Sequence, residues 1–298
     1  MSGSTPQSAI ILLVLGNFLA ILSDVVIKAG GTDIPVFQFV LMRTVLTLSC
    51  LLLFWRKIHW TRMGQSWGVH VVRAHAHLVG IACMVVALST LPLATANAIF
   101  YAAPLLVVVL SLLFTRDKVS VMAIAAVISG FLGVLIILRP VSFGWASLAA
   151  LGTALSLAVG AMLVPRLPPD QTTIHKLFAN YLFMLPVAVV LAIWEQSPWT
   201  VQTFWYAMAS SLFILGYNVT VLLAYRIVAA NRVTSAEYTG LIWAVIIGWL
   251  GFGEMPDVYF VIGAMLIVVP LLFISMQAMR QHKRNRQLTA GKQLKAPC

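Results

Sequence analysis

Twelve polar or charged residues stand inside long apolar stretches of this chain, and their side chains suit solute binding or proton transfer. Polar groups in such surroundings are costly, and they usually face a water-filled cavity or a partner side chain. They are Asn17, Asp24, Arg43, His75, His77, Asn97, Tyr101, Asn180, Tyr217, Asn218, Glu237 and Tyr238.

Asn97, Tyr101 and Pro104 are spaced by four and three residues, so they share one face of a predicted helix. Tyr238 stands in the second half of the chain where Tyr101 stands in the first. Amide and phenol groups can hydrogen-bond to a solute, and paired rings can contact its apolar part. We therefore predict that Asn97, Tyr101 and Tyr238 bind substrate. Helix packing with an interfacial hydroxyl group is the alternative.

Two further groups of this kind, Tyr217 and Asn218, lie in the middle of another apolar stretch and are predicted to bind the solute. Pro104 has a different predicted role. It leaves a carbonyl one turn earlier without its helical partner, which favours a bend during gating.

Arg43 and Asp24 are the charged residues set deep in the first two apolar stretches. Their depths differ by about 6 Å at a rise of about 1.5 Å per residue, which an arginine side chain can cover. The pattern fits a structural ion pair, or an Asp24 paired with Lys28 one turn later. Arg43 could instead recognise an anionic group of the substrate, with Asp24 taking part in gating or coupling.

Two residues are candidates for proton coupling. Glu237 is the one glutamate inside an apolar stretch, and a buried carboxyl can carry a proton. An interfacial Glu237, or one paired with Arg226 or Arg232, is an equally good interpretation. His77 can titrate near neutral pH and lies deep in its stretch, whereas Arg73 on the same stripe is expected at the water interface.

The chain carries no sequence pattern of an enzyme. It has no P-loop for ATP, no nucleophile elbow and no clustered histidines and carboxylates for a metal. Its three cysteines are scattered, which excludes a disulfide framework and a cysteine metal site. We predict neither catalytic residues, nor a metal, nor a cofactor.

Composition requires a membrane around these residues. The chain is 61% hydrophobic and 9% charged, against about 25% charged residues in soluble domains. Apolar stretches of about 20 residues match the hydrocarbon thickness as helices, which predicts an all-α membrane protein. We place ten spans at 8–28, 35–55, 68–89, 94–114, 119–138, 144–165, 173–193, 203–226, 233–253 and 257–277. The first lacks the basic start of a signal peptide and is expected to be retained.

The pattern of the first half repeats in the second at an offset of 137 residues, as in Tyr101 and Tyr238. Each copy holds five spans, at 1–141 and 142–279, and residues 280–298 form a basic tail. Because five is odd, the two copies must cross the membrane in opposite directions. Inverted repeats of this kind are the architecture of many alternating-access transporters.

Positive charge is distributed unevenly between the predicted loops. Of the 19 lysines and arginines, 16 fall on the side of both termini, which predicts that this side is cytoplasmic. The net charge of +11 is thereby explained without nucleic-acid binding. The basic tail would rest on anionic lipid headgroups.

Four stretches give the chain its resemblance to the drug/metabolite transporter superfamily, and to its EamA-type members in particular. They are Leu91–Pro104, Ile137–Pro140, Ala224–Arg226 and Glu237–Glu254. Where the family commonly has glutamate, this chain has Asp117, which keeps the charge. The resemblance implies a ten-helix carrier in the bacterial inner membrane that often exports amino acids or related compounds. Members that import are known as well.

Together these features predict a secondary transporter of a small organic metabolite, such as an amino acid or a related aromatic compound. Export is the favoured direction, and a proton is the candidate coupling ion. The cavity is expected between spans three, four, eight and nine, in a monomer or a homodimer. An importer of metabolites or vitamins is the alternative. A passive channel and an intramembrane lipid enzyme are weaker ones, because no acid/base or metal cluster is present.

Overall fold

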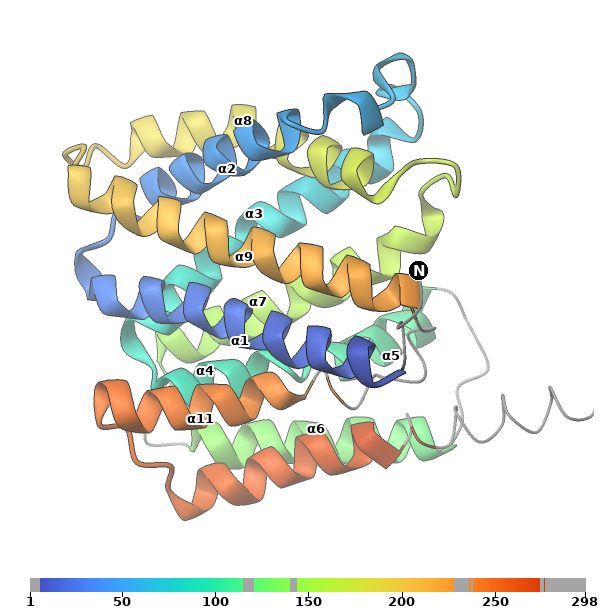
Figure 1. Cartoon of the computed structure of the whole chain (residues 1–298). Helices are drawn as coiled ribbons and strands as arrows, with labels where there is room; N and C mark the ends of the chain where they lie inside the picture. The colour runs from blue at the N-terminus through green and yellow to red at the C-terminus, as the bar shows by residue number, and fades with distance from the viewer. Residues whose placement is uncertain are drawn as a thin grey trace, which may run out of the picture.

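The described part of this computed structural model is entirely helical (Figure 1). It covers residues 6–114, 121–139, 144–227, 236, 238–273 and 276. The principal helices are α1 (Pro6–Gly30), α2 (Val36–Leu52), α3 (Trp67–Thr90), α4 (Leu93–Phe100), α5 (Ala103–Phe114), α6 (Val121–Leu138), α7 (Trp145–Leu163), α8 (Thr173–Trp194), α9 (Val201–Ile227) and α11 (Thr239–Phe252). A further helix, Val258–Phe273, follows α11.

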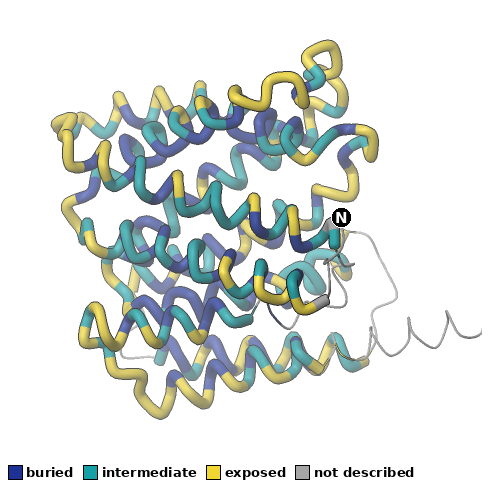
Figure 2. The backbone as a smooth tube through the Cα atoms, viewed as in Figure 1, coloured by how far each residue is buried: buried dark blue, intermediate teal, exposed yellow. Residues whose placement is uncertain are grey.

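These helices make ten membrane crossings, as the hydropathy pattern predicts. Seven helical segments are long and apolar enough to span a bilayer, among them Leu93–Phe114, which joins α4 and α5 into one crossing. Shorter apolar helices, α2, α11 and Val258–Phe273, supply the other three. Figure 2 shows exposed residues along the outward faces of the helices, and many of these are large apolar side chains such as Val121 and Leu135. Such a surface suits contact with lipid rather than water.

The loops gather at two ends of the bundle, and contacts between them fix which loops share an end. Arg62, between α2 and α3, pairs with Asp170, between α7 and α8. In the same region the Thr172 hydroxyl donates to the Lys57 carbonyl at 2.7 Å. We call this the basic end; α1 begins there (Figure 1). The opposite end, called the far end, holds Lys28 and Glu254, whose side chains are 2.7 Å apart.

Corresponding helices of the two repeats run in opposite directions. Helix α1 starts at the basic end and finishes at the far end, while α7 starts at the far end and runs back (Figure 1). The contacts between helices show the same symmetry. Helix α1 contacts α9, and their counterparts in the other repeat, α7 and α3, also contact each other. Helix α2 contacts its own counterpart, α8. The Ser129 hydroxyl even donates to the carbonyl of Leu266, which is 137 residues away. The chain is thus an inverted-repeat bundle.

The fourth crossing is interrupted beside Pro104. Helix α4 ends at Phe100 and α5 begins at Ala103, with Tyr101 and Ala102 in a turn. Proline has no backbone N–H to donate and crowds the preceding turn, so a helix readily breaks here. Both α4 and α5 contact α7.

Candidate functional site

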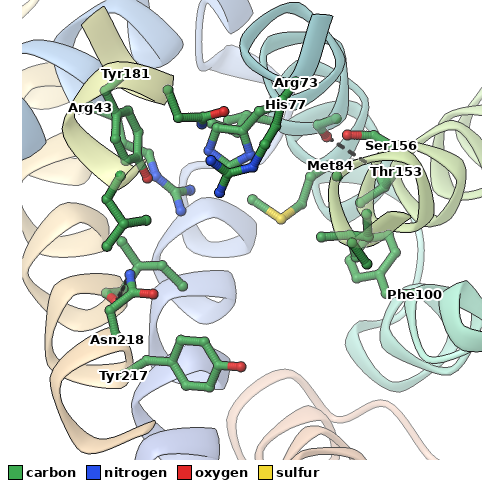
Figure 3. Close-up of a pocket in the computed structure, with 18 of the residues that line it drawn as sticks. Arg43, Arg73, His77, Met84, Phe100, Thr153, Ser156, Tyr181, Tyr217 and Asn218 are labelled. Carbon is green, nitrogen blue, oxygen red and sulfur yellow. Dashed lines mark hydrogen bonds between the residues drawn. The ribbon is translucent and has the colours of Figure 1, made fainter. Parts of the chain in front are cut away.

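A cavity of about 350 Å³ lies in the interior of the bundle, a size that suits a small organic molecule (Figure 3). Its walls come from α2, α3, α7, α8 and α9, with Phe100 added from the end of α4. Arg73, Leu177 and Val164 extend the lining toward the basic end, where α3 and α8 begin and α7 ends. No described residue of the far-end loops lines it.

Polar side chains gather in one part of this cavity. Arg43 comes from α2, Arg73 and His77 from α3, and Asn180 and Tyr181 from α8. The rings of His77 and Tyr181 meet edge to face at 5.4 Å between centroids. Both guanidinium groups act electrostatically on His77 and on Tyr181, so all four groups belong to one cluster. Figure 3 shows the two arginine side chains converging on the same part of the cavity.

Arg43 is buried and takes part in none of the ion pairs in the described part of the chain. Its side chain is only 3% exposed, and neither Nε nor Nη1 has a hydrogen-bond partner among the described residues. The predicted ion pair with Asp24 is not formed, because none of the ion pairs in the described part of the chain joins them. The Asp24 carboxyl interacts with the side chain of Asn97 and acts on Arg43 only electrostatically, without a direct contact. The Arg43 guanidinium is therefore available to a ligand.

Arg73 lies on α3 one helical turn before His77, nearer the basic end, and it also lines the cavity. Its Nη1 donates to the carbonyl of Lys176 at 3.1 Å, which fixes the side chain across the start of α8. Sequence reasoning placed Arg73 in water at the membrane surface, whereas here it lines the cavity. The difference arises because α8 covers that face of α3, and a single helix does not reveal its neighbours.

Most of the remaining lining is apolar or aromatic. Ile81, Met84, Phe100, Leu157 and Ile214 supply most of it. Two hydroxyl groups in this region hold helices together: Ser156 donates to the Ala76 carbonyl at 2.6 Å, and Thr153 donates to the Gly80 carbonyl at 3.3 Å. They join α7 tightly to α3, so they shape the wall of the cavity.

Four of the predicted site residues line the cavity: Arg43, His77, Tyr217 and Asn218. Tyr217 and Asn218 approach from α9, opposite the arginines (Figure 3). The Asn218 amide donates to the Ile214 carbonyl at 2.8 Å, which leaves its oxygen facing outward from the helix. His77 Nε2 is buried and has no hydrogen-bond partner among the described residues.

The remaining predicted residues lie elsewhere. Tyr101 and Tyr238 are brought together, with ring centroids 5.9 Å apart, but neither is among the residues that line the cavity. Asn97 is buried and donates to the Leu93 carbonyl at 3.1 Å, inside α4. Pro104 lies at the α4–α5 break, also outside the lining, and Glu237 falls outside the described residues.

The cavity also uses residues and helices that sequence reasoning missed. The predicted cavity lay between spans three, four, eight and nine. The observed lining also uses α2, α7 and α8, and α11, the ninth span, does not contribute to it. Asn180 was noted as an intramembrane polar residue, while Tyr181 was not. One signal could have found Asn180: it stands 137 residues after Arg43, at the equivalent place in the second repeat. A binding residue in one inverted repeat directs attention to its counterpart.

The far end is closed by a hydrogen-bonded network of Lys28, Glu254, Leu91 and Leu93. Lys28 Nζ pairs with Glu254 at 2.7 Å and donates to the Leu91 carbonyl at 2.8 Å. The other carboxylate oxygen of Glu254 accepts the Leu93 N–H at 2.7 Å, at the start of α4. This far-end network ties α1 and the α3–α4 turn to the loop after α11.

Glu195 makes a second link at the same end. Its carboxylate accepts the N–H groups of Phe37 at 3.1 Å and Gln38 at 2.9 Å, so it satisfies the free N-terminus of α2 from the end of α8. The bundle therefore has a cavity that extends toward one end and a set of polar links across the other.

Comparison with known proteins agrees with this architecture. The EamA-like transporter family matches the chain twice, over residues 7–139 and 142–276. A pseudopaline exporter of Pseudomonas aeruginosa is 25% identical over 276 residues, covering 90% of this chain and 96% of the relative. A riboflavin transporter of Vibrio cholerae is 28% identical over 234 residues, covering 75% and 76%.

Two more similarities cover most of the chain. An S-adenosylmethionine uptake transporter of Rickettsia prowazekii is 24% identical over 265 residues, covering 85% of this chain and 87% of the relative. A protein of known crystal structure shares the fold, with a TM-score of 0.59 and 19% identity, over 93% of this chain and 99% of the other. The family and these named relatives are transporters rather than enzymes. The chain belongs to the EamA-like transporter family of the drug/metabolite transporter superfamily.

Proposed function

We propose that this protein is a secondary transporter that moves a small organic metabolite across the bacterial inner membrane by alternating access. The observation that carries the proposal is the cavity, which extends toward the basic end while polar links cross the far end. In an inverted-repeat carrier, the two repeats can exchange conformations, which closes the cavity to one side of the membrane and opens it to the other. The present arrangement corresponds to one half of that cycle.

The basic end is the cytoplasmic one in this proposal. Among the described residues, the basic end carries Arg56, Lys57, Arg62, Arg166 and Lys176 against Asp170. The far end carries Asp33, Glu195, Glu254 and Asp257 against Lys28 and Arg139. Cytoplasmic loops of membrane proteins hold the excess of lysine and arginine. The cavity would then be reached from the cytoplasm.

Export is the proposed direction, with an amino acid or a related aromatic compound as the solute. A cavity open to the cytoplasm can load a metabolite made there, and the relative from Pseudomonas aeruginosa, which covers nearly the whole chain, is named an exporter. Uptake is the second candidate, because the relative from Rickettsia prowazekii is named an uptake transporter.

Proton coupling through His77 and Glu237 remains part of the proposal. His77 is favoured by its position in the cavity wall and its unpartnered Nε2. A proton taken up there would stand beside two arginines, so the charge of the solute bound next to them would affect proton binding at His77. Replacing His77 with glutamine should then uncouple uptake into vesicles from an imposed pH gradient while exchange persists.

Reconstituted vesicles provide the test of the carrier mechanism. Purified protein is placed in liposomes loaded with a candidate metabolite, and entry of the labelled compound is followed with and without unlabelled compound inside. A carrier gives saturable uptake that is accelerated by internal solute. Uptake that rises linearly with concentration and ignores internal solute would make the protein a channel.

A further inference from the structure

We infer that the transported solute carries a carboxylate attached to an apolar or aromatic body. This inference rests on the proposed transport function and names the substrate class of the same cavity. The first observation is charge balance: Arg43 and Arg73 both line the cavity, and none of the described lining residues is acidic.

Burial makes that imbalance informative. An arginine that is 3% exposed, with two guanidinium nitrogens lacking any hydrogen-bond partner in the described part of the chain, is unfavourable in the empty protein. An anion in the cavity would supply the acceptor that these two nitrogens lack, and with it a negative charge in direct contact with the guanidinium. The planar fork of a guanidinium matches the two oxygens of a carboxylate, so this anion is well suited to Arg43.

The arrangement of Arg43 and Arg73 favours one carboxylate shared by both side chains. Each acts on the same two neighbours, His77 and Tyr181, and their side chains converge in Figure 3. Arg73 is already held by the Lys176 carbonyl through one nitrogen, which leaves the remainder of its fork for a ligand. A ligand with an ammonium group and no carboxylate would meet two like charges here.

The rest of the ligand is defined by the opposite wall. Ile81, Met84 and Phe100 offer apolar and aromatic surface, and Tyr217 adds a ring from α9. The Asn180 side-chain oxygen is buried and without a donor among the described residues, so it can accept one hydrogen bond from the ligand. The fitting molecule is an organic acid with a ring or branched chain, of a size that about 350 Å³ can hold.

A matched set of three probes tests whether the cavity recognises the carboxylate charge of its ligand. Binding of 3-phenylpropanoate, 3-phenylpropanamide and 3-phenylpropylamine to the purified full chain is measured by calorimetry, because these three differ mainly at one group. The carboxylate should bind at least tenfold more tightly than the amide and the amine. In Arg43→Gln the advantage over the amide should fall about 10-fold to 100-fold, as hydrogen bonds to charged groups contribute about 1.5–3 kcal/mol.

Arg56→Gln is the matched control, because it removes the same type of side chain from an exposed loop at the basic end. It should keep the preference of the original chain. Arg43→Gln should melt no lower than the original, since it removes a buried charge that is in no direct ion pair and has two nitrogens without hydrogen-bond partners in the described part of the chain. A large drop in melting temperature would assign Arg43 a structural role and overturn the inference, as would an equal affinity for all three probes or an unchanged preference in Arg43→Gln.

Transport separates this inference from the proposed function. If vesicles show saturable counterflow of amine or amide probes and exclude the carboxylate, the protein is a carrier and the anion inference is wrong. If no probe shows saturable counterflow while the carboxylate still binds with the Arg43-dependent preference, the anion site stands and the carrier mechanism fails.

Discussion

Replacing Glu254 with glutamine should release the far end of the bundle. The side chains of Lys28 and Glu254 are 10% and 20% exposed, so their ion pair is largely shielded from water. Glutamine keeps an oxygen for the Leu93 N–H but removes the charge that Lys28 pairs with. Lys28 would then retain the Leu91 carbonyl and the Phe252 ring, whose centroid lies 5.3 Å from Nζ.

The size of the effect follows from the partners that are lost. A hydrogen bond to a charged group contributes about 1.5–3 kcal/mol, and exposed pairs contribute about 0–1 kcal/mol. For this partly buried pair we take about 2 kcal/mol. That energy stabilises only the state in which the far end is closed, so its loss shifts the population toward the open state by about 30-fold.

Cysteine labelling measures this shift directly. The native cysteines are replaced, and Ile81, which is buried in the cavity wall, is changed to cysteine as the reporter. A membrane-impermeant maleimide is added from the far side, to intact cells or to vesicles of known orientation. The labelling rate should rise by up to about 30-fold in Glu254→Gln.

Asp257→Asn supplies the matched control at the same end. The side chains of Asp257 and of its partner Arg139 are 46% and 40% exposed. Loss of this ion pair should therefore change the labelling rate by no more than about fivefold. Asparagine can still accept the Phe260 N–H that Asp257 accepts at 2.7 Å. Equal labelling rates in both variants and in the parent would refute a gating role for the far-end network.

The other predictions concern packing and the helix break. Gly133→Ala should lower stability by about 1–3 kcal/mol, because its Cβ would stand 2.5 Å from the Gly263 carbonyl oxygen; thermal unfolding in detergent measures this. Gly68→Ala, with no heavy atom within 4 Å of the added carbon, should leave the melting temperature unchanged or raise it. Pro104→Ala should join α4 to α5 and slow counterflow without weakening ligand binding; an unchanged rate would contradict a role for the break.

Much of the fold could be predicted because membrane helices are specified locally. Lipid requires each helix to satisfy its own backbone, so a run of about 20 apolar residues determines a span by itself. The predicted span 173–193 and helix Thr173–Trp194 agree for this reason. The break at Pro104 is equally local, since it follows from the missing N–H of one residue.

The lining of the cavity depends instead on how helices meet. Gly80 lets α7 approach α3 so closely that a Cβ there would overlap the Ser156 side chain. That contact sets the face which α3 turns toward the cavity, and it brings in Arg73 and His77. A hydropathy pattern shows which face of a helix is polar but not which helix packs against that face. Tyr101 and Tyr238, which the sequence repeat relates to each other, lie side by side in the structure, but they are not among the residues that line the cavity.

The two repeats are alike in backbone and unlike in charge, and this difference bears on mechanism. Arg43 and Arg73 in the first repeat correspond, at the offset of 137, to Asn180 and Ser210 in the second. Symmetric backbones allow the bundle to exchange its two conformations. If the proposed anion binds to Arg43 and Arg73, the first repeat would hold it in both conformations, and the solute would stay bound to that repeat while the second moves past it.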